Sequence, residues 1–177
     1  MIYELGDLKP ELAEDVFVAP DAVVIGDVKI GAGSGIWFGS LVRGDVHYIR
    51  IGERTNVQDH SVLHVTGGKF PLEIGNDCTL GHRVTLHGCT LHDHAFIGIG
   101  ATVMDDCEVG EFAMVAAGAL VTPGKKIAPR SVWMGAPAKF VREITPAEEE
   151  MIRSIPEKYC KLKDKYRDPA TFRQAGN

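Results

Sequence analysis

The chain has few aromatic residues and few cysteines. Aromatic residues make up 7% of its 177 residues, and none of the four cysteines stands in a Cys-x-x-Cys pair. Because that spacing is typical of zinc and redox sites, we expect no cysteine-rich metal site. Cys78 and Cys107 are interpreted as small residues of the core.

The sequence also lacks a basic stretch and an N-terminal apolar run. The net charge is −5, and residues 1–17 (MIYELGDLKPELAEDVF) include acidic residues and no signal-peptide core. No segment has the roughly 20 apolar residues that a membrane span needs. These absences argue against nucleic-acid and membrane partners, and they predict a cytoplasmic protein.

What the sequence does contain is a six-residue repeat. Three hexads would complete one triangular coil, so the repeat predicts an all-β solenoid of roughly six coils between Val18 and Trp133. Gly often follows the aliphatic residue of a hexad, and the position four after that residue is usually small. The aliphatic positions are Val18, Val24, Ile30, Ile36, Val42, Ile51, Val57, Leu63, Ile74, Leu80, Leu86, Leu91, Ile97, Val103, Val109, Val115, Val121 and Ile127.

The repeat divides the chain into three parts. Residues 1–17 are expected to form a lead-in that caps the first coil, residues 18–139 the solenoid, and residues 140–177 a helical segment. Two interruptions of the repeat, at residues 47–50 and 66–71, predict a bulged corner and a loop that leaves the coil.

The last part of the chain has helical periodicity. Thr145, Pro146 and Glu148 form the pattern of an N-cap, a first-turn proline and a capping box. Pro156 interrupts the apolar face that follows, so we predict two short helices packed along the outside of the coils. The apolar residues of this face are Met151, Ile152, Ile155, Tyr159, Leu162 and Tyr166.

Three of the seven histidines occupy positions suited to a metal. His64 and His87 each follow the aliphatic residue of the same face in consecutive coils. Their backbones should therefore stack about 4.8 Å apart with both rings pointing outward. Arg43 falls in the same column one coil earlier. His82 belongs to the preceding face, beyond a corner, so a neighbouring subunit would have to bring it to the other two.

Three imidazoles with an open fourth position are the ligand set of a catalytic zinc site. A cyclic homotrimer would form this site three times, each time with two histidines from one chain and one from the next. Imidazole also suits iron and cobalt, so the sequence does not choose among these metals. Of the other histidines, His47 is interpreted as a surface residue, His92 and His94 as residues of a solvated turn, and His60, which lies outside the pattern, as a non-ligand.

At these positions the sequence resembles the gamma-class carbonic anhydrases, a branch of the hexapeptide-repeat superfamily. The resemblance covers nearly the whole chain and implies a left-handed parallel β-helix. It also implies a zinc cofactor and the reversible hydration of carbon dioxide to bicarbonate. The residues that carry it are Arg43-Gly44-Asp45, Gln58-Asp59, His64, His82, His87 and the ending Gly-Ala-Pro-Ala-Lys at 135–139.

The resemblance further implies roles for individual residues. In the family, the residue matching Gln58 hydrogen-bonds the nucleophile, and the residue matching Asp59 supports it. The residues matching Arg43 and Asp45 hold the subunit interface. The family also places a helix near a neighbouring site, which makes Tyr159 a candidate active-site residue.

The sequence departs from the family at its proton-transfer groups. Val46 follows Asp45 where the family prototype has a Glu, and the loop at 66–71 carries Lys69 and no carboxylate. Hydration would then be slow or use another relay. Two alternatives stay open. One is a hexapeptide acyltransferase that uses acyl-coenzyme A, with His82 or His87 as general base. The other is a non-catalytic metal-binding trimeric scaffold.

Overall fold

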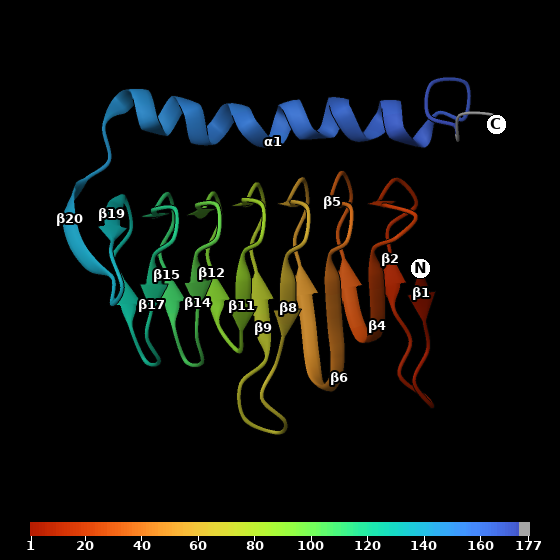
Figure 1. Cartoon of the computed structure of the whole chain (residues 1–177), viewed down its shortest axis with the longest axis horizontal. Helices are drawn as coiled ribbons and strands as arrows, with labels where there is room; N and C mark the ends of the chain where they lie inside the picture. The colour runs from red at the N-terminus through yellow and green to blue at the C-terminus, as the bar shows by residue number, and fades with distance from the viewer. Residues whose placement is uncertain (174–177) are drawn as a thin grey trace.

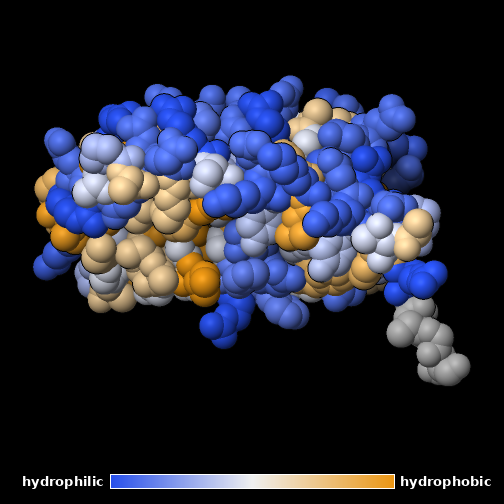
Figure 2. Space-filling view, turned by 90° about the horizontal axis from the view of Figure 1, so that it is seen from above, coloured by the Kyte–Doolittle hydropathy of each residue, from blue (hydrophilic) through white to orange (hydrophobic). Residues whose placement is uncertain are grey.

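The computed structural model describes residues 1–173 and is a parallel β-solenoid with one long helix alongside it (Figure 1). The helix, α1 (Pro146–Arg167), runs along the length of the coils. Seen from the helix side, the surface is mainly hydrophilic (Figure 2). The predicted fold class, an all-β solenoid with helical structure packed alongside, is confirmed.

One face of the solenoid is an eight-stranded sheet. Its first seven strands are parallel and in register, and they mark about seven turns. This is one turn more than predicted, because the seven strands from the first to the last each belong to a separate turn. The strands, in order, are β3 (Phe17–Val18), β5 (Gly35–Ile36), β7 (Asn56–Val57), β10 (Thr79–Leu80), β13 (Phe96–Ile97), β16 (Met114–Val115), β19 (Ser131–Met134) and the antiparallel β20 (Lys139–Glu143).

The other two faces belong to one twelve-stranded sheet, because two long strands continue around the corner between them. These are β4 (Val23–Ile30) and β6 (Leu41–Ile51). One face continues with β8 (Val62–His64), β11 (Thr85–His87), β14 (Thr102–Val103) and β17 (Leu120–Val121). The other continues with β9 (Leu72–Ile74), β12 (Thr90–Leu91), β15 (Glu108–Val109) and β18 (Lys126–Ile127). At the N-terminal end, β1 (Ile2–Tyr3) and β2 (Glu11–Leu12) pair with β4.

Both interruptions of the repeat are visible in the structure. Residues 47–50 lie within β6, and the register between β4 and β6 shifts between Gly26 and Val28. Residues 66–71 leave the coil between β8 and β9 as the longest loop of Figure 1, closed by a bridge between Thr66 and Phe70. The domain boundaries at residues 17 and 139 stay predictions.

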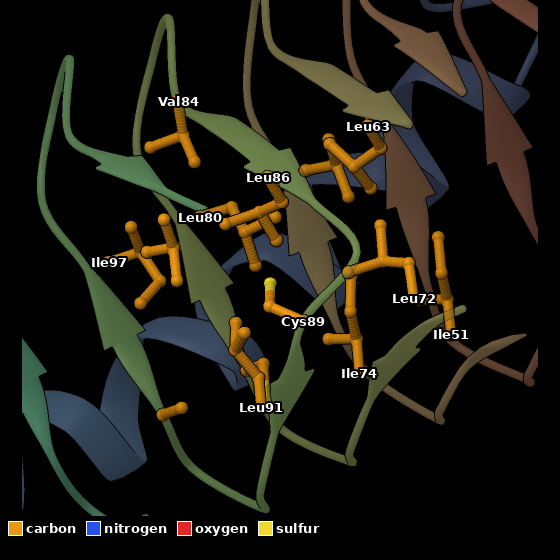
Figure 3. Packing of buried hydrophobic residues seen from close by; sticks show 14 of the residues in the cluster. Ile51, Leu63, Leu72, Ile74, Leu80, Val84, Leu86, Cys89, Leu91 and Ile97 are labelled. Carbon is orange, nitrogen blue, oxygen red and sulfur yellow. The ribbon is translucent and has the colours of Figure 1, made fainter. Parts of the chain in front are cut away.

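The core consists of the repeat positions. Every repeated aliphatic residue except Val18 is at most 4% exposed, and these side chains meet inside the coils (Figure 3). Complete burial of one such side chain contributes about 1.5–3 kcal/mol, so the stack of turns is the main source of stability. Cys78 and Cys107 are buried free thiols, as expected of core residues, and burial raises the pKa of Cys78 to about 12.

Buried hydroxyls connect consecutive turns. Each donates a hydrogen bond of 2.8–3.3 Å to a backbone carbonyl of the following turn. Because buried polar groups need such partners, these bonds fix how successive coils stack. The pairs are Ser34 to Gly52, Ser40 to Gln58, Thr55 to Gly75, and Ser61 to Gly81.

The prediction of two short helices is wrong, because α1 continues through Pro156. A proline inside a helix removes one backbone hydrogen bond, and here its ring is buried against the solenoid. The buried face is formed by Ile152, Pro156 and Lys163, whereas Met151 and Leu162 of the predicted face are 37% and 38% exposed.

The predicted start of the helix is confirmed. Thr145 is the N-cap, and it forms a complete capping box with Glu148. At the other end of the buried face, Lys163 is 3% exposed and its Nζ lies 3.3 Å from Asp15 Oδ2, so an ion pair ties the helix to the turn before β3. Within the described residues, no helix combines the length and apolar character needed to span a bilayer.

Candidate metal centre

The two stacked histidines meet as the repeat predicts. His64 on β8 and His87 on β11 are partners in the parallel register, and both rings are partly buried. His64 Nδ1 lies 3.1 Å from His87 Nε2. Two nitrogens bound to one tetrahedral zinc ion at about 2.0–2.1 Å would be roughly 3.4 Å apart. The spacing of this pair therefore suits a shared metal ion.

Each of these rings has a carboxylate on its other nitrogen. His64 Nε2 lies 3.0 Å from Asp45 Oδ1, and His87 Nδ1 lies 2.7 Å from Asp105 Oδ1. A carboxylate only accepts, so each of these nitrogens donates, and in a neutral imidazole the remaining nitrogen carries a lone pair. Two lone pairs consequently face each other between the rings, an arrangement that a cation satisfies.

Asp105 was not identified from the sequence. It opens the turn after β14, the strand that stacks on β11, and its second oxygen accepts a 3.0 Å hydrogen bond from Thr66 Oγ1. The signal available in the sequence was the position of Asp105 next to the column of residues that contains His64 and His87. The contact with Thr66 also ties the loop at residues 66–71 to the histidine pair.

Arg43 and Asp45 form an ion pair within the chain. Burial acts to raise the pKa of Asp45, but hydrogen bonds from His64 and Arg43 outweigh it and hold the pKa below its usual value. Gly44 between them has no room for a side chain, since a Cβ there would lie 2.6 Å from the backbone oxygen of Asp27. The predicted pairing of Arg43 across a subunit interface stays a prediction.

His82 lies in the turn after β10, beyond the corner, as predicted. Its Nδ1 is 2.8 Å from Asp59 Oδ2, and its side chain is 44% exposed. Within residues 1–173, no three His, Cys, Asp or Glu side chains of one chain are grouped to hold a metal ion. A single chain therefore holds two separate parts of the candidate metal centre, the His64–His87 pair and the His82–Asp59 pair.

Gln58 and Tyr159 are associated with the sheet that α1 covers. Gln58 is 7% exposed, and its Nε2 donates a 3.0 Å hydrogen bond to Asn56 Oδ1. Tyr159 packs edge-on against Trp37, with 5.3 Å between ring centroids. Burial, and then the charge of Asp59, raise the pKa of Tyr159.

The four remaining histidines have other contacts. His92 Nε2 lies 2.7 Å from Glu108 Oε1, and the ring of His94 stacks on Phe112 at 4.4 Å between centroids. His47 Nδ1 accepts a 2.9 Å hydrogen bond from its neighbour's backbone, and the ring of His60 lies against Gly39.

Comparison with known proteins first defines the class. The family model "Bacterial transferase hexapeptide (six repeats)" matches residues 88–123. The solved structure of the BC4754 gene product of Bacillus cereus, described provisionally as an acetyltransferase, superimposes with a TM-score of 0.92 at 40% identity. The match covers 94% of this chain and 96% of that one. The molecule has the fold of a hexapeptide-repeat protein.

Relatives with established names narrow the class. Gamma carbonic anhydrase 2 from mitochondria of Arabidopsis thaliana is 47% identical over 161 residues, which is 88% of this chain and 58% of that protein. The chain thus spans little more than half of the plant relative. A carbonic anhydrase of Geobacillus kaustophilus is 40% identical over 167 residues, covering 94% of this chain and 91% of that protein. The chain belongs to the gamma carbonic anhydrase-like family of hexapeptide-repeat proteins.

Proposed function

We propose that this protein is a zinc-dependent carbonic anhydrase that interconverts carbon dioxide and bicarbonate as a homotrimer. The observation that carries the proposal is the geometry of two rings: His64 Nδ1 and His87 Nε2 lie 3.1 Å apart, while carboxylate oxygens lie within 3.0 Å of the other two ring nitrogens. Membership of the family, which includes proteins named carbonic anhydrases, supports the same reaction.

The third ligand of this proposal is His82 of a neighbouring subunit. Asp59 engages Nδ1 of His82, which leaves Nε2 to bind a metal, so all three imidazoles would share one arrangement with a carboxylate behind the ring. Such carboxylates fix the tautomer of a ligand and increase its basicity. Three neutral imidazoles suit zinc, and they also accept iron or cobalt.

The bound metal would supply a nucleophile at neutral pH by lowering the pKa of water. The chain's own residues would orient it. The amide nitrogen of Gln58 donates to Asn56, so the amide oxygen of Gln58 is the atom that would accept a hydrogen bond from the nucleophile and orient it toward carbon dioxide. Asp59 would hold the ring of His82. The half-buried Tyr159 would limit the entry of water beside Asp59. Because Val46 and the loop at 66–71 supply no carboxylate, we expect slow hydration.

The first test removes the ligands one at a time. His64→Ala and His82→Ala should each lose stoichiometric zinc while the circular dichroism spectrum stays that of the wild type. His92→Ala, which changes a histidine paired with Glu108 on another face, is the matched control and should keep its metal. Elemental analysis of the purified variants measures this, and full zinc occupancy in either ligand variant would contradict the site.

The second test measures the reaction itself. Metal-loaded wild-type protein should hydrate carbon dioxide in a stopped-flow assay, prepared with and without oxygen so that an iron-dependent activity is also detected. Protein that binds metal at three sites per trimer but has no hydration activity would support the alternative of a non-catalytic scaffold, which the absent carboxylates favour.

An acyltransferase is a second candidate, favoured by the description of the Bacillus cereus protein. In that reading His82 or His87 would act as a general base toward acyl-coenzyme A. Calorimetric titration with acetyl-coenzyme A separates the two, since a carbonic anhydrase should show no binding. The cytoplasmic location predicted from the sequence is part of this proposal, and cell fractionation tests it.

A further inference from the structure

The corner of β6 is wider than the corner of β4 beside it. β6 has four residues, 45–48, where β4 has Asp27 alone, so these four residues bulge away from the coil. Figure 1 shows the corner of β6 reaching farther than that of β4. Together with Leu8 near the N-terminus and Gly68 of the loop at 66–71, the bulge encloses an open hollow of about 370 Å³.

The hollow adjoins the candidate metal centre at two points. The first is Asp45, which lines the hollow and whose Oδ1 lies 3.0 Å from His64 Nε2. The second is the loop that closes the hollow at Gly68. Thr66 of the same loop donates a hydrogen bond to Asp105, the carboxylate behind the second histidine of the pair. The hollow therefore lies beside groups that support both stacked histidines.

Two of the titratable side chains that line the hollow are carboxylates held in ion pairs. Asp27 Oδ1 lies 2.7 Å from Arg50, and Asp45 pairs with Arg43. Carboxyl groups normally titrate near pH 4, well below the pH at which the proposed reaction would run. Neither carboxylate is therefore suited to take up and release protons near neutral pH.

The other two titratable side chains of the hollow are Tyr48 and His47. The Tyr48 hydroxyl donates a 2.7 Å hydrogen bond to Glu73, and this bond raises the pKa of Tyr48, so the phenol keeps its proton. His47 is partly buried, and within residues 1–173 it has no ion-pair partner. Imidazole is the side chain that ordinarily changes its charge between pH 5 and 8. His47 is thus the group of the hollow best suited to carry protons.

We propose that His47 carries protons from the metal centre across the hollow to solvent. This inference rests on the proposed function, because each carbon dioxide converted to bicarbonate releases one proton that has to leave the site. The hollow opens to solvent, since Val46 on its rim is 53% exposed. Val46 and Gly68 border the hollow without supplying a carboxylate, which leaves this task to the imidazole.

The hydrogen bond of His47 indicates how its ring would work. Nδ1 accepts a 2.9 Å hydrogen bond from the backbone N–H of Tyr48, so the neutral ring has its proton on Nε2. To take up a proton at Nδ1, the ring must leave that N–H. The imidazolium cannot restore the contact, because both atoms would then be donors. The charged ring therefore turns toward solvent, where a buffer base removes one proton and the neutral ring returns.

The experiment measures hydration by stopped flow in dilute and in concentrated buffer. In dilute buffer, where the protein must supply the proton carrier, His47→Ala should lower kcat about tenfold or more. Its kcat/KM should stay that of the wild type, because this ratio reports the conversion of carbon dioxide before the proton leaves. Imidazole added to the buffer should restore kcat, since it replaces the missing ring. His92→Ala, on another face, is the matched control and should behave as wild type.

A second measurement does not depend on activity. In cobalt-loaded protein the paramagnetic ion should broaden the NMR signals of the His47 ring protons relative to zinc-loaded protein, while those of His92 stay sharp. Spectra of His47→Gln and His92→Ala assign the signals. His47→Gln cannot take up a proton, so it also repeats the kinetic test should His47→Ala fold poorly.

The outcomes separate this inference from the proposed function. An active wild type whose His47 variants keep its kcat in dilute buffer would overturn the proton carrier alone. Equal widths of the His47 signals with cobalt and with zinc would also overturn it, because His47 would then lie far from the metal. A metal-loaded wild type without hydration activity would overturn the proposed function and the proton carrier together.

Discussion

At the scale of single residues, the carboxylates behind the histidines determine what the histidines can do. Asp45, Asp59 and Asp105 each engage one ring nitrogen, and they come from three different coils. An imidazole held in this way keeps one tautomer and one orientation. The repeat predicts where the histidines lie, but their chemistry depends on these partners.

Replacing Asp105 tests this dependence. In Asp105→Asn the amide no longer holds His87 Nδ1 with a charged acceptor, so metal affinity should fall about 10- to 100-fold with the fold unchanged. Competition with a fluorescent chelator measures the affinity. Asp106→Asn is the matched control, because its side chain is 57% exposed and its nearest ion-pair contact is Lys126 at 4.0 Å. Equal affinities in the two variants would show that Asp105 does not support a ligand.

At the scale of elements, α1 is held by its first turn and its buried face. The carboxylate of Glu148 accepts hydrogen bonds from the backbone of Thr145 and from Arg142. The Arg142 contact is the main cause that lowers the pKa of Glu148 to about 2. This contribution to helix stability is therefore complete above the ordinary pKa of about 4.5 and is lost as the pH falls toward 2.

Acidification should consequently loosen the first turn of α1. Between pH 4.5 and pH 2, amide exchange protection at Glu148 and Glu149 should fall by an amount equivalent to about 1 kcal/mol, the usual contribution of an N-cap. Hydrogen-exchange mass spectrometry, corrected for the intrinsic effect of pH, measures it. Glu148→Gln cannot titrate, so its protection in this window should be constant. A wild-type helix with equally constant protection would contradict the role of the carboxylate.

At the scale of the whole molecule, the proposed function brings the two parts of the candidate metal centre together through a second chain. Val42 pairs with Leu63 of β8, so Arg43 extends the His64–His87 column. Its side chain is 40% exposed, and it pairs with Asp45. In the proposed trimer it lies at the interface, where removal of one partner of a buried charge pair costs about 2–5 kcal/mol.

Arg43→Ala should therefore shift the trimer toward single chains. Light scattering coupled to size exclusion at decreasing protein concentration measures the mass. Arg54→Ala, which removes a bidentate contact with Asp77 at another corner, should leave the mass unaltered. An Arg43→Ala variant that remains trimeric at the lowest concentration would remove Arg43 from the interface.

The sequence by itself determined the solenoid, its core positions and the stacking of His64 on His87. These follow from a six-residue period, and a period acts locally in every hexad, so it can be read without knowing the whole fold. It also indicated the helix start at Thr145, because a capping box is a local signal.

Only the tertiary structure decided the rest. α1 passes through Pro156 and buries Lys163 because the solenoid supplies a surface and Asp15 a partner, and neither is encoded in the helix itself. Likewise, Asp105 reaches His87 because β14 stacks on β11, which places the turn after β14 beside the ring. Contacts made at corners, between residues of different coils, depend on how the turns stack, and that geometry exists only once the chain is folded.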